Sequence, residues 1–148
     1  MTKRKLVSDF RRAEESPGLL LWQLSNKWQA KQRAALKLFD LTHVQFVLLA
    51  ALTYADGTSS LTQKQLAEYA QTDIMMTSQV LRKLEQKGLV QRKPSWLDGR
   101  AFTPSPTAAG VELANRAIKI VEKVDKNFFA AVDPELTSLV KMMRLLVK

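Results

Sequence analysis

The stretch from Leu61 to Pro104 constrains the fold most, because it holds two short amphipathic helical patterns followed by two short apolar runs. The first helical pattern follows Thr62, whose side-chain oxygen is suited to cap a helix. A polar break separates it from the second pattern, which begins near Asp73. The apolar runs 89–90 and 101–103 predict two paired strands with a loop between them. Helix, turn, helix and hairpin in this order predict a winged helix-turn-helix.

The second helix of this pair has two contrasting faces. Apolar residues and one threonine recur at three- and four-residue steps and are predicted to point inward: Ile74, Thr77, Val80, Leu81 and Leu84. The predicted outward face holds Met75, Ser78, Gln79, Arg82 and Lys83. Hydroxyl, amide and cationic groups suit base edges and phosphates, although such a stripe is often only a solvated helix face. Its place before a basic hairpin favours DNA contact over that simpler role.

Three segments of this stretch together resemble the MarR family: the run 61–67 (Leu-Thr-Gln-Lys-Gln-Leu-Ala), the run 84–92 (Leu-Glu-Gln-Lys-Gly-Leu-Val-Gln-Arg) and the turn Asp98-Gly-Arg100. The resemblance extends from about Pro17 to the C-terminus. It implies a dimeric winged-helix transcription regulator, in many members a repressor released by a small phenolic or other amphipathic ligand. By match to the family, Arg100 enters the minor groove and Asp98 braces it. A turn-stabilising ion pair between these two residues is the simpler interpretation, and the two roles are compatible.

The chain is strongly basic, with a net charge of +9 over 148 residues, which predicts a polyanionic partner. Much of the surplus lies in two places. Residues 1–12 hold five basic residues and one acidic residue, and residues 62–104 hold seven and four. The arm 1–15 has no clear period and is expected to be flexible rather than to read bases.

Long amphipathic patterns flank the central stretch, and an almost wholly apolar pattern after Thr42 predicts a buried central helix. The last two helices are predicted to start at Thr107 and at Asp133-Pro134. A core accounts for about half of this apolar surface, so we expect a twofold dimer to cover the rest. The expected fold is mainly α (α+β), with one domain over 1–148: arm 1–15, dimerisation helices 16–40 and 105–148, and DNA-binding lobe 42–104.

Cysteine is absent and His43 is the single histidine, so neither a histidine-based catalytic triad nor a zinc site of His and Cys ligands can be assembled. We expect no enzyme activity, catalytic residue, metal or cofactor. The N-terminus lacks a secretory pattern and no apolar run is long enough to span a bilayer, which predicts a cytoplasmic protein without a membrane partner.

An effector, if the resemblance extends that far, is expected where the DNA-binding lobe meets the dimerisation helices. The candidates for the lining of its pocket are Trp22, Trp28, Phe39, His43 and Phe46. Packing in the core is the simpler role for these side chains, and it is the one we favour.

The sequence therefore predicts a sequence-specific double-stranded DNA-binding regulator, a homodimeric repressor of a pseudo-palindromic operator. The expected contacts are Met75, Ser78 and Gln79 to bases, Arg82 and Lys83 to bases or phosphates, and Gln63, Lys64, Arg92 and Lys93 to phosphates. Gln79 stands where many family members have arginine, which favours adenine over guanine. Two alternatives remain: a winged-helix protein-interaction module whose basic surface serves solubility, and a sequence-blind architectural DNA binder.

Overall fold

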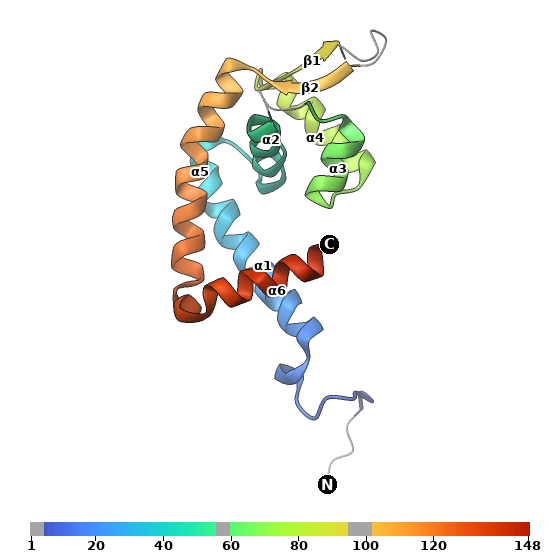
Figure 1. Cartoon of the computed structure of the whole chain (residues 1–148), viewed down its shortest axis with the longest axis vertical. Helices are drawn as coiled ribbons and strands as arrows, with labels where there is room; N and C mark the ends of the chain where they lie inside the picture. Colours follow the sequence, from blue (N-terminus) through green and yellow to red (C-terminus); the bar gives the residue numbers. More distant parts are fainter. Residues whose placement is uncertain (1–4, 56–59, 95–101) are drawn as a thin grey trace.

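The computed structural model describes residues 5–55, 60–94 and 102–148 of the chain. Helices dominate, and the strands form one antiparallel pair, which confirms the predicted mainly α class with a small hairpin (Figure 1). The elements are α1 (Pro17–Leu36), α2 (His43–Ala55), α3 (Gln63–Ala70), α4 (Ile74–Gln86), β1 (Val90–Pro94), β2 (Phe102–Pro106), α5 (Ala108–Phe128) and α6 (Leu136–Val147). Short 3-10 segments lie at η1 (Ala13–Glu15), η2 (Lys37–Phe39) and η3 (Ala130–Glu135).

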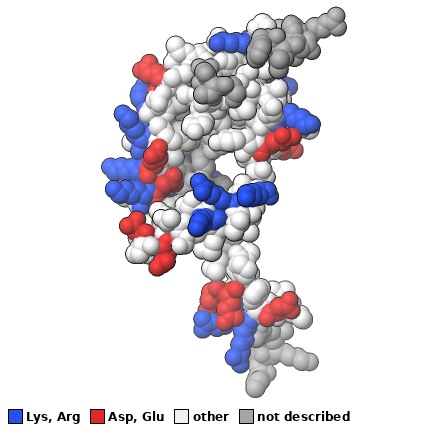
Figure 2. All heavy atoms as spheres, in the orientation of Figure 1, with Lys and Arg blue, Asp and Glu red and all other residues white. Residues whose placement is uncertain are grey.

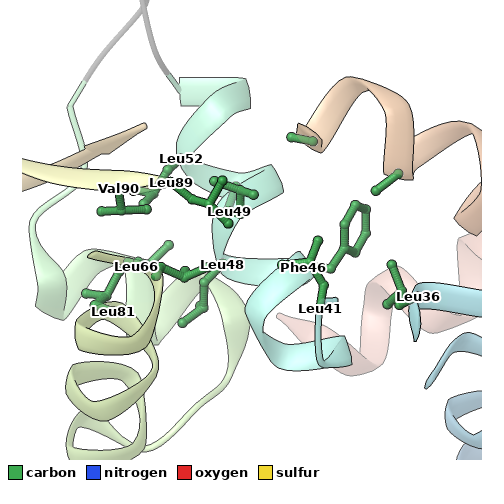
Figure 3. Close-up of a cluster of buried hydrophobic side chains, with 14 of the residues drawn as sticks. Leu36, Leu41, Phe46, Leu48, Leu49, Leu52, Leu66, Leu81, Leu89 and Val90 are labelled. Atoms are coloured by element: carbon green, nitrogen blue, oxygen red, sulfur yellow. The ribbon is translucent and has the colours of Figure 1, made fainter. Parts of the chain in front are cut away.

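Helix α2 forms the centre of the core, as its apolar composition predicts. Leu48 and Leu49 are fully buried. On one side Leu48 meets Leu66 of α3 and Leu81 of α4, and on the other Phe46 points toward Leu36 at the end of α1 (Figure 3). Burial of several leucines, each contributing about 1.5–3 kcal/mol, thus joins the α3–α4 pair to the long helices α1 and α5.

The turn between α3 and α4 is set by residues that the sequence marks as helix ends. Thr62 and Gln65 form a reciprocal capping box at the start of α3, with N–H to side-chain oxygen distances of 3.1 and 2.9 Å. Gln71 ends α3 in the left-handed conformation with φ of 56°. Asp73 then caps α4, because its Oδ1 accepts the N–H groups of Met75 and Met76. The predicted starts of both helices are confirmed.

The hairpin is longer than the sequence predicts. Strands β1 and β2 pair from Val90 opposite Pro106 to Pro94 opposite Phe102, whereas the prediction covered only 89–90 and 101–103. Prolines are usually excluded from central strands because they lack an N–H donor. A two-stranded sheet has only edge strands, so these prolines are tolerated.

Helix α5 runs alongside α1 and α2, and α6 turns back from its far end (Figure 1). Thr107 caps α5 as predicted, since its Oγ1 accepts the N–H of Gly110 at 3.0 Å. The last helix begins at Leu136 rather than at Asp133-Pro134, because Val132 interrupts the helical backbone and residues 130–135 form η3.

Among the described residues no single helix is both long and apolar enough to cross a membrane. The segment from α1 through η2 to α2 is long and apolar enough when taken together, but the two helices are bent by 73° relative to each other. The apolar residues of α2 are explained by its burial in the core.

Candidate nucleic-acid interface

Helix α4 turns its predicted outward residues toward solvent. Gln79, Arg82 and Lys83 are exposed, and Met75 is 72% exposed. Ser78 is half-buried, with the Arg82 guanidinium donating to its hydroxyl oxygen at 3.4 Å. The structure thus presents hydroxyl, amide and cationic groups together along one exposed side of a 13-residue helix.

The opposite face of α4 enters the core as predicted, with one exception. Thr77, Leu81 and Leu84 are buried, and Val80 packs partly against them. The inward prediction is wrong for Ile74, which is more than half exposed. Ile74 is the first residue of the helix, directly after its cap, and α4 reaches the core only from Thr77 onward.

The end of α4 is fastened by a residue that sequence reasoning missed. The ammonium group of Lys87 donates to the backbone carbonyl of Asp40 and, at 3.1 Å, to the side-chain oxygen of Gln45. Asp40 adopts the left-handed conformation after η2, which turns its carbonyl toward α4. No local signal in the sequence links positions 40, 45 and 87, because the contact depends on how α2 and α4 pack.

A groove lies between the start of α2 and the outward face of α4. Its volume is about 520 Å³, and Thr42, Val44 and Gln45 form one wall. The other wall is formed by Gln79, Val80, Arg82, Lys83 and Gln86. Several of the predicted DNA-contacting side chains therefore border a concave surface rather than a flat helix face.

The flanking elements carry further candidate side chains. Lys64 is exposed and Gln63 half-buried in the first turn of α3, and Arg92 and Lys93 are exposed on β1. The Nε group of Arg92 forms an ion pair with Glu85 of α4 at 2.8 Å, which ties the hairpin to the helix. Arg92 is thus partly neutralised, which lowers the charge that it offers to a phosphate.

The predicted tip of the hairpin lies outside the described residues. This includes Trp96, Asp98 and Arg100, so the minor-groove contact remains a prediction. Figure 2 shows cationic side chains near the hairpin and also along α5 and α6, so the positive charge of this face is spread over several elements.

The predicted ligand-pocket residues separate into different surroundings. Trp28 and His43 meet at the junction of α1 and α2, with ring centroids 4.9 Å apart in an edge-on arrangement. Phe46 is buried in the core, whereas Trp22 is exposed on the first half of α1. Phe39 packs partly against the core, and the guanidinium of Arg116 lies 5.7 Å from its ring centre.

A partly buried polar cluster surrounds Trp28. The Asp125 carboxylate accepts the indole N–H of Trp28 at 2.7 Å and the side-chain amide of Gln32 at 2.8 Å. Burial lowers the pKa of His43 below its ordinary value of 6.5, a shift that Asp125 opposes and Arg33 reinforces. These contacts give Trp28 and His43 a structural role at the α1–α2–α5 junction.

A cavity lies between α2, α3 and α5. Its volume is about 760 Å³, and aromatic and aliphatic side chains dominate its lining. Tyr54, Tyr69 and Asn115 add polar atoms to the lining, and of the predicted pocket residues only Phe46 reaches it. The cavity lies where the DNA-binding lobe meets the long helix α5, but the rest of its lining was not predicted.

A capped helix pair whose second helix exposes amide and cationic groups, followed by a paired hairpin, defines the class of winged helix-turn-helix transcriptional regulators. The MarR family model matches residues 41–102. The HTH-type transcriptional regulator YdcH of Bacillus subtilis is 49% identical over 126 residues, 84% of this chain and 85% of that protein. The HTH-type transcriptional repressor Rv2887 of Mycobacterium tuberculosis is 35% identical over 119 residues, 80% and 84% of the two chains. The chain belongs to the MarR family.

Solved structures have the same fold. CouR from Rhodococcus jostii RHA1 bound to p-coumaroyl-CoA matches with a TM-score of 0.83 and 19% identity, over 93% of this chain and 96% of that chain. The S. aureus MepR–DNA complex matches with a TM-score of 0.76 and 25% identity, over 91% and 99% of the chains. The predicted family and fold are confirmed.

Proposed function

We propose that this chain is a cytoplasmic, non-enzymatic homodimeric repressor that binds a pseudo-palindromic operator through α4 and the hairpin. The observation that carries the proposal is the exposed face of α4, where Gln79 and Arg82 stand on a helix held at its first turn by Asp73 and at its end by Lys87. A fixed helix places its donors at constant positions in the groove, which sequence recognition requires. The repressor name of Rv2887 and the DNA complex of MepR support it.

The contacts divide by chemistry. In this proposal Ser78, Gln79 and Met75 face base edges. Arg82 and Lys83 reach bases or phosphates, and Gln63, Lys64, Arg92 and Lys93 hold phosphates. Arg100, braced by Asp98, enters the minor groove. Gln79 favours adenine, because its amide can donate to N7 and accept from N6 at the same time.

A dimer follows from apolar surface that a single chain leaves exposed. The first half of α1 exposes Leu20, Leu21, Trp22 and Leu24, and α6 has no buried residue. Helices 16–40 and 105–148 are the proposed dimerisation elements, and burying their apolar faces against a second copy removes this area from water. A twofold axis then places two α4 helices in successive major grooves, about 34–36 Å apart.

Release by a small ligand is assigned to the cavity between α2, α3 and α5. The cavity lies between the dimerisation helix α5 and the α3–α4 pair that is proposed to contact DNA. Its aromatic lining, with tyrosine and asparagine groups, suits an amphipathic or phenolic molecule. A ligand releases the operator only when it binds more tightly to a dimer whose two α4 helices are misplaced for successive grooves. CouR, which has this fold, was solved with p-coumaroyl-CoA bound.

The test is selection of duplexes from random sequence with the purified protein, followed by titration of the selected duplex at several salt concentrations. We expect log affinity to fall steeply with log salt, by about 0.9 for each phosphate neutralised. Two single variants, Arg82→Gln and Lys83→Gln, should each reduce that slope by about one. Absence of binding to any duplex would favour the protein-interaction module. A mismatch series without effect on affinity would instead identify an architectural binder.

A further inference from the structure

The first turn of α4 carries three consecutive apolar side chains that stand in water. Ile74 is 54%, Met75 72% and Met76 41% exposed. Contiguous exposed apolar side chains of this kind commonly mark an interaction site. The core does not need them, since Thr77, Leu81 and Leu84 supply the buried face of the helix. The turn therefore needs a partner that offers an apolar group.

Met75 lies at the middle of the outward face of α4. Gln79, Arg82 and Gln86 follow it at four, seven and eleven residues, which places all four on one side of the helix. Ile74 and Met76 flank this line. The backbone of the turn is fixed, because the Asp73 carboxylate accepts the N–H groups of Met75 and Met76 at 2.6 and 3.0 Å.

Residues in the first turns of a recognition helix are the ones that meet base edges in the major groove. The edges of guanine, cytosine and adenine present only donors and acceptors there, and a thioether would leave them unpaired. Thymine alone presents an apolar group, its C5-methyl. We infer that Met75 contacts the C5-methyl group of one thymine in each operator half-site, so that it acts as a specificity determinant beside Gln79. This inference rests on the proposed function.

The experiment uses the full-length protein and the duplex selected from random sequence. Each thymidine of one half-site is replaced in turn by deoxyuridine, which removes the methyl group and keeps every hydrogen-bonding group. We expect one position at which affinity falls about fourfold, the effect of losing one buried methyl contact. Thymidines elsewhere in the half-site should be insensitive to replacement.

Variants assign the contact to Met75. Met75→Ala should bind the thymidine and deoxyuridine duplexes equally, and Met75→Leu should restore the preference for thymidine. The matched control Met76→Ala changes a neighbouring methionine off the central line and should keep the preference. Met75 is exposed and alanine favours helix, so the variant is expected to fold, which circular dichroism verifies.

The outcomes separate this inference from the proposed function. If the protein selects a duplex but no deoxyuridine replacement lowers its affinity, the methyl contact is overturned and the repressor proposal stands. The methyl contact is also overturned if Met75→Ala retains the wild-type preference. If the protein selects no duplex, both fall. Capture of a protein partner by this turn, abolished by Met75→Ala, would then be the expected replacement.

Discussion

The ammonium group of Lys87 donates a hydrogen bond at 3.1 Å to the side-chain oxygen of Gln45, and so joins the end of α4 to the start of α2. The same oxygen accepts the backbone N–H of Thr42 at 3.1 Å, while the Thr42 hydroxyl accepts the N–H of Gln45. The capping box of the central helix thus also holds the helix proposed to read DNA. Movement of α2 relative to its neighbours would be transmitted directly to α4.

Replacing Lys87 by methionine should separate anchoring from DNA contact. The Lys87 side chain is only 30% exposed, and loss of its bonds to Asp40 and Gln45 should lower the free energy of unfolding by about 1 kcal/mol, measured in urea. Affinity for all duplexes should fall together. The control Lys83→Met should leave the free energy of unfolding within about 0.5 kcal/mol and reduce the salt slope of DNA binding instead. Equal stability of the two variants would refute the anchoring role.

Gly110 should not tolerate a side chain. A Cβ atom there would lie 2.0 Å from the carbonyl oxygen of Leu89, which already accepts the Thr107 N–H at 3.0 Å. Backbone has little freedom to move, so Gly110→Ala should destabilise the fold by about 3 kcal/mol in thermal or urea unfolding. Gly18→Ala is the matched control, because its Cβ would meet nothing closer than the Ser16 hydroxyl at 3.9 Å. That variant should be as stable as the wild type or slightly more stable.

The pKa of His43 makes stability depend on pH. Burial lowers the pKa of His43 in the folded state below 6.5, so the unfolded chain takes up the proton first as pH falls. The stabilisation from the neutral imidazole is therefore present above pH 6.5. It is lost as pH falls from there through the folded pKa. Because the chain has one histidine, a His43→Gln variant should lack this component when urea unfolding is measured between about pH 5 and pH 8.

Local signals in the sequence located the starts of α3, α4 and α5 correctly, because the physics of capping acts over three or four residues. Thr62, Asp73 and Thr107 each accept the backbone N–H that their position predicts. Apolar composition likewise identified α2 as the buried helix, and periodicity identified the outward face of α4. Where prediction went wrong, as at Ile74, the periodic pattern began three residues before Thr77, the point at which the helix meets the core.

The candidate site was less predictable wherever it depends on contacts between distant segments. The bonds of Lys87 to Asp40 and Gln45 and those of Asp125 to Trp28 and Gln32 join residues about 40 to 100 positions apart. Nothing in the local residue pattern encodes such pairs. The cavity beside Tyr54 and Tyr69 has the same origin, since its shape follows from the packing of α3 and α5 around α2.

Gln79→Ala should relax one position of the operator. Loss of a bidentate amide contact to adenine should cost about 1–3 kcal/mol at that base pair and leave the other positions unchanged. Repeating the selection from random duplexes with the variant measures this directly. Gln86→Ala, the same change further along the exposed face, is the control and should select the wild-type site. Identical selection by Gln79→Ala and wild type would remove Gln79 from the base contacts.

The dimer can be tested with charges placed on its proposed interface. Leu21 of α1 and Leu146 of α6 are 64% and 84% exposed in the single chain, so glutamate at either position costs the isolated fold little. In a dimer the same carboxylate would be buried without a partner, which is strongly unfavourable. Leu21→Glu and Leu146→Glu should therefore sediment as monomers in analytical ultracentrifugation.

Loss of the dimer should also weaken operator binding, because a monomer engages one half-site and forfeits the linked second contact. Tyr54→Glu provides the control, since Tyr54 is 86% exposed on α2, outside the proposed dimerisation helices 16–40 and 105–148. That variant should stay dimeric and bind the full operator as the wild type does. If all three variants sediment alike, the apolar faces of α1 and α6 do not form the dimer, and the spacing of the two α4 helices must be set by another surface.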